Sequence, residues 1–134
     1  MLVFNEEYSV TPFFKIYTQF IIDTLKQYKW DVKVEEFTMQ TPLGPKNFTN
    51  VIGTLNPKAD RVLAFAAHYD SKILPVVNGK YFTAATDSAV PCAMLLDFAK
   101  DLGEKVKDLK VFICTVFVLT NSKKLIKTFT VGIL

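Results

Sequence analysis

The spacing of apolar residues predicts an amphipathic helix near the start of the chain. Between Phe13 and Tyr28 apolar residues recur at intervals of three and four, which is the period of one helix face. Thr11 and Pro12 precede this run and suit the N-cap and the first helical position. The face consists of Phe13, Ile16, Tyr17, Phe20, Ile21, Leu25 and Tyr28. We therefore expect a helix that packs this whole face into a core.

The next part of the chain changes to a period of two, which is typical of strands. Apolar and charged residues partly alternate over residues 30–40, so a half-buried strand is predicted there, with an irregularity at Glu35-Glu36. Residues 41–45 have the proline and glycine of a turn. Residues 47–55 predict a second strand, and the pair is expected to form a hairpin.

The second half of the chain alternates between strand and helix patterns. Residues 61–69 form a continuous apolar run, which predicts a central buried strand of a parallel sheet. A long loop over 70–86 leads to a predicted helix over 88–102, with Gly103 as its C-cap. A further buried strand is predicted over 111–119. This order of elements indicates an α/β fold.

Composition narrows the class of protein. The chain has 134 residues, which is one domain's worth, and 50% of them are hydrophobic, so it is globular. Its 16 basic and 13 acidic residues are scattered without a basic stripe, so nucleic-acid binding is not indicated. No apolar run reaches the length of a membrane span, and the first residues lack the features of a secretory signal peptide. Two cysteines, Cys92 and Cys114, are too few for a disulfide scaffold, and the sequence leaves open whether they pair.

Two short polar runs are candidates for chemistry. His68-Tyr69-Asp70-Ser71-Lys72 follows the predicted buried strand, and Asp87 stands just before the next helix. Ligands bind at such strand ends in open α/β sheets. A metal-binding histidine commonly donates its second N–H to a carboxylate, and Asp87 could supply an oxygen ligand. The same residues also suit a turn and a helix N-cap, so the spacing alone leaves both interpretations open.

The amino-acid sequences of these runs resemble those of a known family. HYDSK at 68–72, ATDSAVPCAM at 85–94 and QTPLGPKNFTNVIGTLNP at 40–57 are similar to the glutaminyl cyclases (glutaminyl-peptide cyclotransferases). The resemblance runs from about residue 18 to 110, and the tail over 111–134 diverges, so residues 1–134 are interpreted as a single partial domain. It implies a zinc-exopeptidase fold: a three-layer sandwich with a mixed, mostly parallel sheet, truncated at its C-terminal side.

The resemblance also implies a reaction. Family members are acyltransferases that convert an N-terminal glutamine of peptides or proteins into pyroglutamate and release ammonia. A zinc ion acts on the γ-amide carbonyl while a glutamate moves the proton. The resemblance assigns Asp87 as a zinc ligand and places His68, Asp70 and Ser71 in the site region, outside the coordination shell. It also implies a secretory location, extracellular or Golgi.

Departures from the family pattern qualify that activity. The family has two adjacent glutamates after the last strand and a distant histidine ligand, whereas here no Asp or Glu follows Asp108 and His68 is the only histidine. We therefore expect a truncated isoform with little or no activity, low stability, exposed apolar surface and self-association through its sheet. A non-catalytic fragment acting through protein interaction is one alternative. A zinc aminopeptidase of the same fold, favoured by His68-Tyr69-Asp70, is the other.

Two further features concern covalent chemistry. Ala67 stands where many family members have a cysteine paired with the one matching Cys92, so Cys92 is expected to be a free, buried thiol. The chain has one glycosylation sequon, Asn47-Phe48-Thr49. Because it falls in a predicted strand, the sequence favours an unused sequon.

Overall fold

The computed structural model describes residues 12–41, 44–70, 74–80, 83–105 and 112–118. These residues form two helices, four strands and one short helical turn. In chain order they are α1 (Pro12–Gln27), β1 (Asp31–Thr41), β2 (Gly44–Leu55), β3 (Val62–His68), the turn η1 (Ala85–Ala89), α2 (Val90–Lys105) and β4 (Phe112–Val118). The predicted order of elements is confirmed.

The four strands form one mixed sheet in the order β1-β2-β4-β3. β1 pairs with β2 and β2 with β4 in antiparallel fashion, while β3 and β4 are parallel. The hairpin register is continuous, from Asp31 opposite Thr54 to Thr41 opposite Gly44. The irregularity expected at Glu35-Glu36 is therefore wrong, because both residues keep regular partners on β2.

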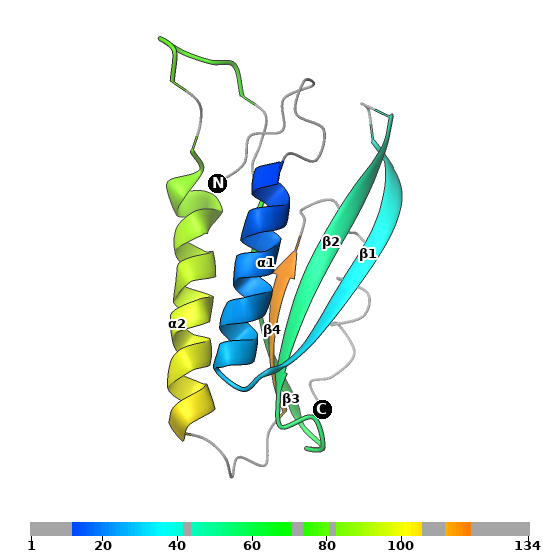
Figure 1. The fold of residues 1–134 in the computed structure, drawn as a ribbon, viewed down its shortest axis with the longest axis vertical. Coiled ribbons are helices and arrows are strands. Elements are labelled where there is room, and N and C mark those ends of the chain that lie inside the picture. Colours follow the sequence, from blue (N-terminus) through cyan, green and yellow to red (C-terminus); the bar gives the residue numbers. More distant parts are fainter. Residues whose placement is uncertain (1–11, 42–43, 71–73, 81–82, 106–111, 119–134) are drawn as a thin grey trace.

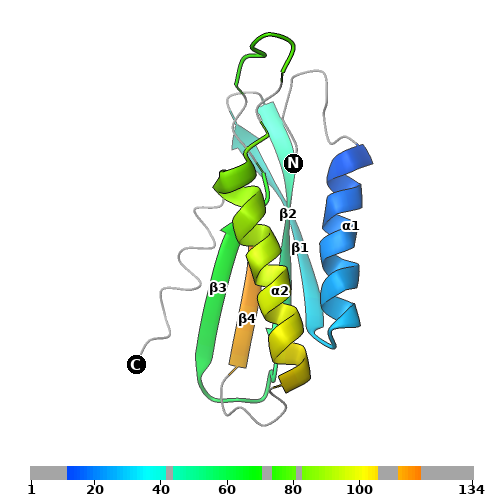
Figure 2. The same ribbon diagram turned by 90° about the vertical axis from the view of Figure 1, so that its left-hand side faces the viewer.

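Within the described sheet β3 is an edge strand (Figure 2), so the expectation of a central strand is wrong for this part of the chain. Leu63 is 48% exposed, and Ala64 and Ala66 are exposed as well. On the helix side, Phe65 meets Phe98 of α2 edge-to-face, with ring centroids 4.7 Å apart. An apolar run shows that a strand suits burial, but it does not say which strands flank it.

Both helices lie on the same face of the sheet (Figures 1 and 2). The described residues therefore build a sheet and one helical layer of the sandwich. The buried core cluster consists of Ile21, Leu25, Trp30, Phe48, Val51, Tyr69 and Ala99. Neither described helix has the length and apolar character needed to cross a membrane.

The C-terminus of α1 is shaped by a left-handed residue that is not glycine. Lys29 has φ of 67°. Its N–H bonds to the carbonyl of Lys26 at 3.0 Å, and the N–H of Trp30 bonds to the carbonyl of Leu25 at 3.1 Å. These two bonds are the Schellman pattern, which satisfies the last carbonyls of the helix. The turn directs Trp30 into the core, where its indole N–H donates to the carbonyl of Ala99 at 2.8 Å.

Gly103 is not the C-cap of α2, and that prediction is wrong, because the helix continues to Lys105. A Cβ atom at Gly103 would lie 2.4 Å from the carbonyl oxygen of Tyr28. The glycine therefore allows α2 to approach the end of α1 closely. Close approach and helix termination both favour glycine, so the sequence could not separate them.

Only the second half of the apolar face of α1 is buried. Leu25 is fully buried and Ile21 nearly so, whereas Ile16 is 60% and Phe20 58% exposed, and Tyr17 is exposed too. The expectation that the whole face packs into the core is wrong for the first half of the helix. This half of α1 therefore leaves large apolar side chains at the surface of the described part of the chain.

Candidate functional site

The end of β3 and the start of α2 meet at one edge of the molecule. The carbonyl oxygen of His68, the last residue of β3, accepts two side-chain hydrogen bonds. One comes from the hydroxyl of Ser88 and the other from the thiol of Cys92, whose sulfur lies 3.2 Å away. Ser88 lies in non-helical backbone just before α2 and Cys92 lies in the first turn of that helix, and both side chains reach the same carbonyl. This clamp fixes Asp87, the neighbour of Ser88, beside the strand end.

The imidazole of His68 lies between two carboxylates. Its Nε2 is 2.6 Å from Oδ1 of Asp87, and its Nδ1 is 3.2 Å from Oδ1 of Asp70 and 3.1 Å from the Asp70 carbonyl oxygen. The structure thus brings together three residues that the sequence singled out. Burial lowers the pKa of His68, but the hydrogen bond to Asp87 and the contacts with Asp70 outweigh it and raise this pKa above 6.5.

The two carboxylates have different surroundings. The Asp70 side chain is 10% exposed, whereas that of Asp87 is 75% exposed. Ser88 is buried next to Asp87, and the peptide bond between them is cis. Asp70 is therefore suited to orienting the imidazole from the inside. Asp87 presents its carboxylate to solvent, where a ligand can reach it.

Tyr69 anchors the same strand end to the neighbouring hairpin. It is buried, and its hydroxyl donates to the carbonyl of Thr49 on β2 at 2.6 Å. Burial raises the pKa of this phenol. Sequence reasoning missed the positioning roles of Tyr69, Ser88 and Cys92, because each depends on a carbonyl that is distant along the chain.

The described residues do not make up a zinc site by themselves. A catalytic zinc normally has three protein ligands. In the described ranges no group of three or more His, Cys, Asp or Glu side chains is arranged to hold a metal ion. Asp87 offers a carboxylate at the surface, and the neighbouring imidazole is already bonded to it. Ser71, the remaining predicted site residue, lies outside the described residues, as do residues 119–124, where the family pattern has its glutamates.

Cys92 is a free thiol in the structure, as predicted. The side chain is half-buried rather than fully buried. Burial raises the pKa of the Cys92 thiol to about 11. At neutral pH the thiol is therefore protonated, which suits its role as a hydrogen-bond donor to His68.

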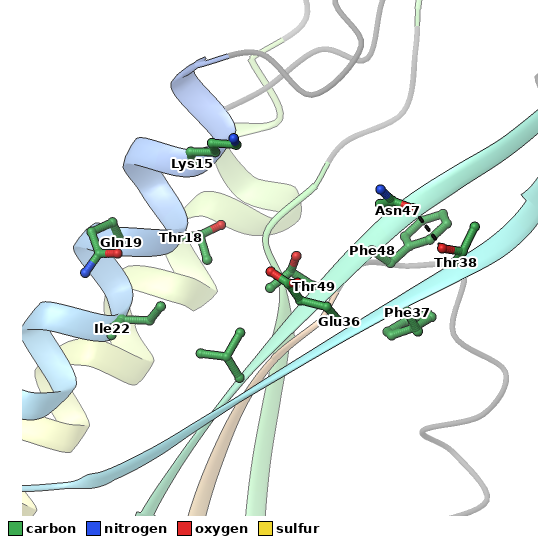
Figure 3. Close-up of a pocket in the computed structure, with 11 residues that line it drawn as sticks. Lys15, Thr18, Gln19, Ile22, Glu36, Phe37, Thr38, Asn47, Phe48 and Thr49 are labelled. Atoms are coloured by element: carbon green, nitrogen blue, oxygen red, sulfur yellow. Dashed lines mark hydrogen bonds between the residues drawn. The ribbon is translucent and has the colours of Figure 1, made fainter.

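A separate groove of about 520 Å³ lies between α1 and the β1–β2 hairpin (Figure 3). Lys15, Gln19 and Ile22 line it from the helix, and Glu36 and Asn47 are among the residues that line it from the hairpin. The cluster around His68 does not contribute to this groove. No sequence pattern predicted it, because it arises from the angle between the helix and the hairpin.

Known proteins are similar to this chain over much of its length. The profile described as peptidase family M28 matches residues 50–121. A glutaminyl-peptide cyclotransferase of Drosophila melanogaster is 48% identical over 96 residues, which are 71% of this chain and 26% of that protein. One from Bos taurus is 49% identical over 84 residues, 63% of this chain and 23% of that protein. The predicted resemblance is confirmed, and the chain spans about a quarter of the length of these relatives.

Solved structures agree on the fold. A glutaminyl cyclase of Macrostomum lignano matches with a TM-score of 0.72 and 33% identity, over 82% of this chain and 32% of that one. A glutaminyl cyclase of Porphyromonas gingivalis matches with a TM-score of 0.75 at 24% identity, over 84% and 41%. A Zn-dependent exopeptidase from Parabacteroides distasonis matches with a TM-score of 0.70 at 20% identity, over 87% and 47%. The predicted α/β fold of the zinc-exopeptidase type is confirmed.

Proposed function

The chain belongs to peptidase family M28, and we propose that it carries one edge of a glutaminyl-peptide cyclotransferase site. The reaction converts an N-terminal glutamine of a peptide or protein into pyroglutamate and releases ammonia. One observation carries the proposal. The segment that is about half identical to named cyclotransferases holds the solvent-facing carboxylate of Asp87 against His68, at the strand end where α/β sheets bind ligands.

Within this site each residue has a proposed role. Asp87 is the zinc ligand of the set, because its carboxylate is exposed while one of its oxygens is held by His68. His68 positions Asp87, and Asp70 orients His68 from the protein side. Carboxylates that bind metals are commonly held by such hydrogen bonds. Ser71 belongs to the site region on the same strand exit.

The 134 residues by themselves are proposed to have little or no cyclising activity. A catalytic zinc normally has three protein ligands, and the carboxylate of Asp87 would supply one of them. The only histidine of the chain already lies on that carboxylate, and no acidic side chain follows Asp108 to move the proton of the α-amine. The zinc ligands and the proton-transferring group would have to come from outside this set.

The direct test is cyclisation of a short peptide that begins with glutamine, read by mass as loss of ammonia. The purified chain is assayed with and without added zinc, after circular dichroism has shown it to be folded. We expect no conversion above the uncatalysed rate. Zinc-dependent conversion that disappears in Asp87→Ala would show that the chain completes the site unaided, and the proposed inactivity would be wrong.

A second candidate is an aminopeptidase on the same fold, favoured by the contact of His68 with Asp87 and by the peptidase family that matches. The substrate distinguishes this aminopeptidase candidate from the cyclotransferase candidate. An aminopeptidase would release a fluorescent amine from a leucyl amide in the presence of zinc. It would leave a glutaminyl peptide uncyclised.

A third candidate is a non-catalytic role through protein interaction, including self-association. It is favoured by the open edge of β3 in the described sheet and by the exposed Leu63 on that strand. Sedimentation velocity over a concentration series tests it, with Leu63→Lys as the variant. A monomer at every concentration would remove self-association from this candidate.

We also propose a secretory location, extracellular or Golgi, as the family resemblance implies. Imaging of the tagged native chain in eukaryotic cells tests it. Diffuse cytosolic signal would contradict it.

A further inference from the structure

Asn47 begins Asn47-Phe48-Thr49, which is the only Asn-X-Ser/Thr sequence in the 134 residues. Because this sequon falls in a strand, the sequence alone favours an asparagine that carries no glycan. In the structure Asn47 lies near the start of β2, in the half of the hairpin next to the turn, and opposite Thr38 on β1. What decides whether an attached sugar can be accommodated is the direction of this side chain.

The side chains of the sequon alternate between the two faces of the hairpin. Asn47 is exposed to solvent, while Phe48 is buried and stacks on Phe37 with ring centroids 5.6 Å apart. Successive strand residues point to opposite faces, so Asn47 lies on the other face of the hairpin from the Phe48 side chain, exposed at the groove beside α1. Although the sequon lies in a strand, its asparagine is therefore at the surface.

The hydrogen bonding of Asn47 leaves the reacting atom available. The hydroxyl of Thr38 donates to Oδ1 of Asn47 at 2.8 Å. Figure 3 shows the amide nitrogen on the side away from Thr38, at the groove between α1 and the hairpin. Attachment of a sugar uses this nitrogen and leaves Oδ1 free to keep its bond to Thr38.

We propose that Asn47 carries an N-linked oligosaccharide when the chain enters the secretory pathway. The co-reactant is an oligosaccharide bound to a lipid pyrophosphate. The amide nitrogen forms a bond to the anomeric carbon, and the bond from that carbon to the pyrophosphate oxygen breaks. The lipid pyrophosphate leaves with the electron pair, and the amide nitrogen loses one proton. The attached glycan stands at the mouth of the groove beside Lys15 and restricts the access of macromolecules to it.

The test uses the full chain behind a cleavable secretory leader, translated with microsomes. Protection from added protease identifies the imported chains. We expect these to run at higher mass, and a glycan-releasing amidase to reverse the shift and convert Asn47 to Asp in the peptide mass. Supplying the leader separates this proposal from that of a secretory location, and neither depends on cyclase activity.

Three variants locate the glycan. Asn47→Gln and Thr49→Ala should abolish the shift, and Thr49→Ser should keep it. Imported, protease-protected wild-type chain without a shift would overturn the proposal, and so would a shift that persists in Asn47→Gln. The amidase should also act on folded chain without denaturant. Release that requires unfolding would contradict the surface position of Asn47.

Discussion

The two ends of α2 are built for different purposes. Near its C-terminus, Ala99 and Gly103 pack against Trp30 and the carbonyl of Tyr28, and the indole N–H donates to the buried carbonyl of Ala99. At its start, the helix is held by side-chain hydrogen bonds and leaves Asp87 in solvent. Burial stabilises the first end, whereas the second end keeps a charge available to a ligand. Substitutions at the first end should therefore change folding, and those at the second should change binding.

Leu25→Ala should have the largest effect, because this side chain has no exposed surface at the packed end. Truncating a buried leucine leaves a cavity, and we expect a loss of about 3 kcal/mol of unfolding free energy. Urea unfolding followed by circular dichroism measures it. Ile16→Ala on the same helix is the matched control and should change stability by less than about 0.5 kcal/mol. Equal losses would contradict the division of α1 into a buried and an exposed half.

Gly103→Ala tests the close approach of the two helices. Alanine is the better helix former, so propensity alone predicts a gain of up to about 1 kcal/mol. The new Cβ would lie 2.4 Å from the carbonyl oxygen of Tyr28. Forcing the helices apart should instead cost about 2 kcal/mol, measured in the same urea experiment. A gain in stability would show that the approach is looser than the structure indicates.

Trp30→Phe removes the hydrogen bond between the indole and α2 at the packed end. The phenyl ring retains much of the apolar surface but cannot donate to the carbonyl of Ala99. Losing this buried hydrogen bond should cost about 1 kcal/mol, again read by urea unfolding. Because Trp30 is the only tryptophan of the chain, circular dichroism rather than fluorescence must follow the transition. Stability equal to that of the parent chain would show that this hydrogen bond does not stabilise the fold.

The pH dependence of stability tests the His68 cluster at the other end. The pKa of His68 is raised in the folded chain above 6.5 by its two carboxylate neighbours. The protonated form is thus favoured by folding, and its contribution is fully present below 6.5 and is lost as the pH rises through the folded value. The urea midpoint of the parent chain should decline across that window relative to His68→Asn. Parallel pH profiles for the two chains would argue against the ion pairs.

Asp87→Ala should have the smallest effect on folding, because its side chain is largely exposed. We expect stability within about 0.5 kcal/mol of the parent chain, but the loss of any residual zinc binding measured by titration calorimetry. Asp97→Ala is the control, since Asp97 is an exposed aspartate on α2 that takes no part in the His68 cluster. Unchanged zinc affinity in Asp87→Ala would remove the proposed role of Asp87.

The sequence by itself determined the elements and the family. The three-to-four spacing predicted α1, the alternating hairpin strands predicted β1 and β2, and the apolar run before His68 predicted β3. These are local patterns, and the period of side chains along a helix or strand is fixed by backbone geometry. The amino-acid sequence around His68 and Asp87 also identified the family. It placed His68 at the end of a strand and Asp87 at the start of a helix.

Only the tertiary structure decided which partners each predicted helix and strand packs against. It left Ile16 and Phe20 exposed, placed β3 at the edge of the described sheet, and turned Gly103 from an expected cap into a point of helix contact. It also brought Ser88 and Cys92 onto the carbonyl of His68. The physical reason is that burial and hydrogen bonding depend on surfaces contributed by distant segments. A pattern along the chain specifies which face can be buried, but only the packed fold supplies the partner that buries it.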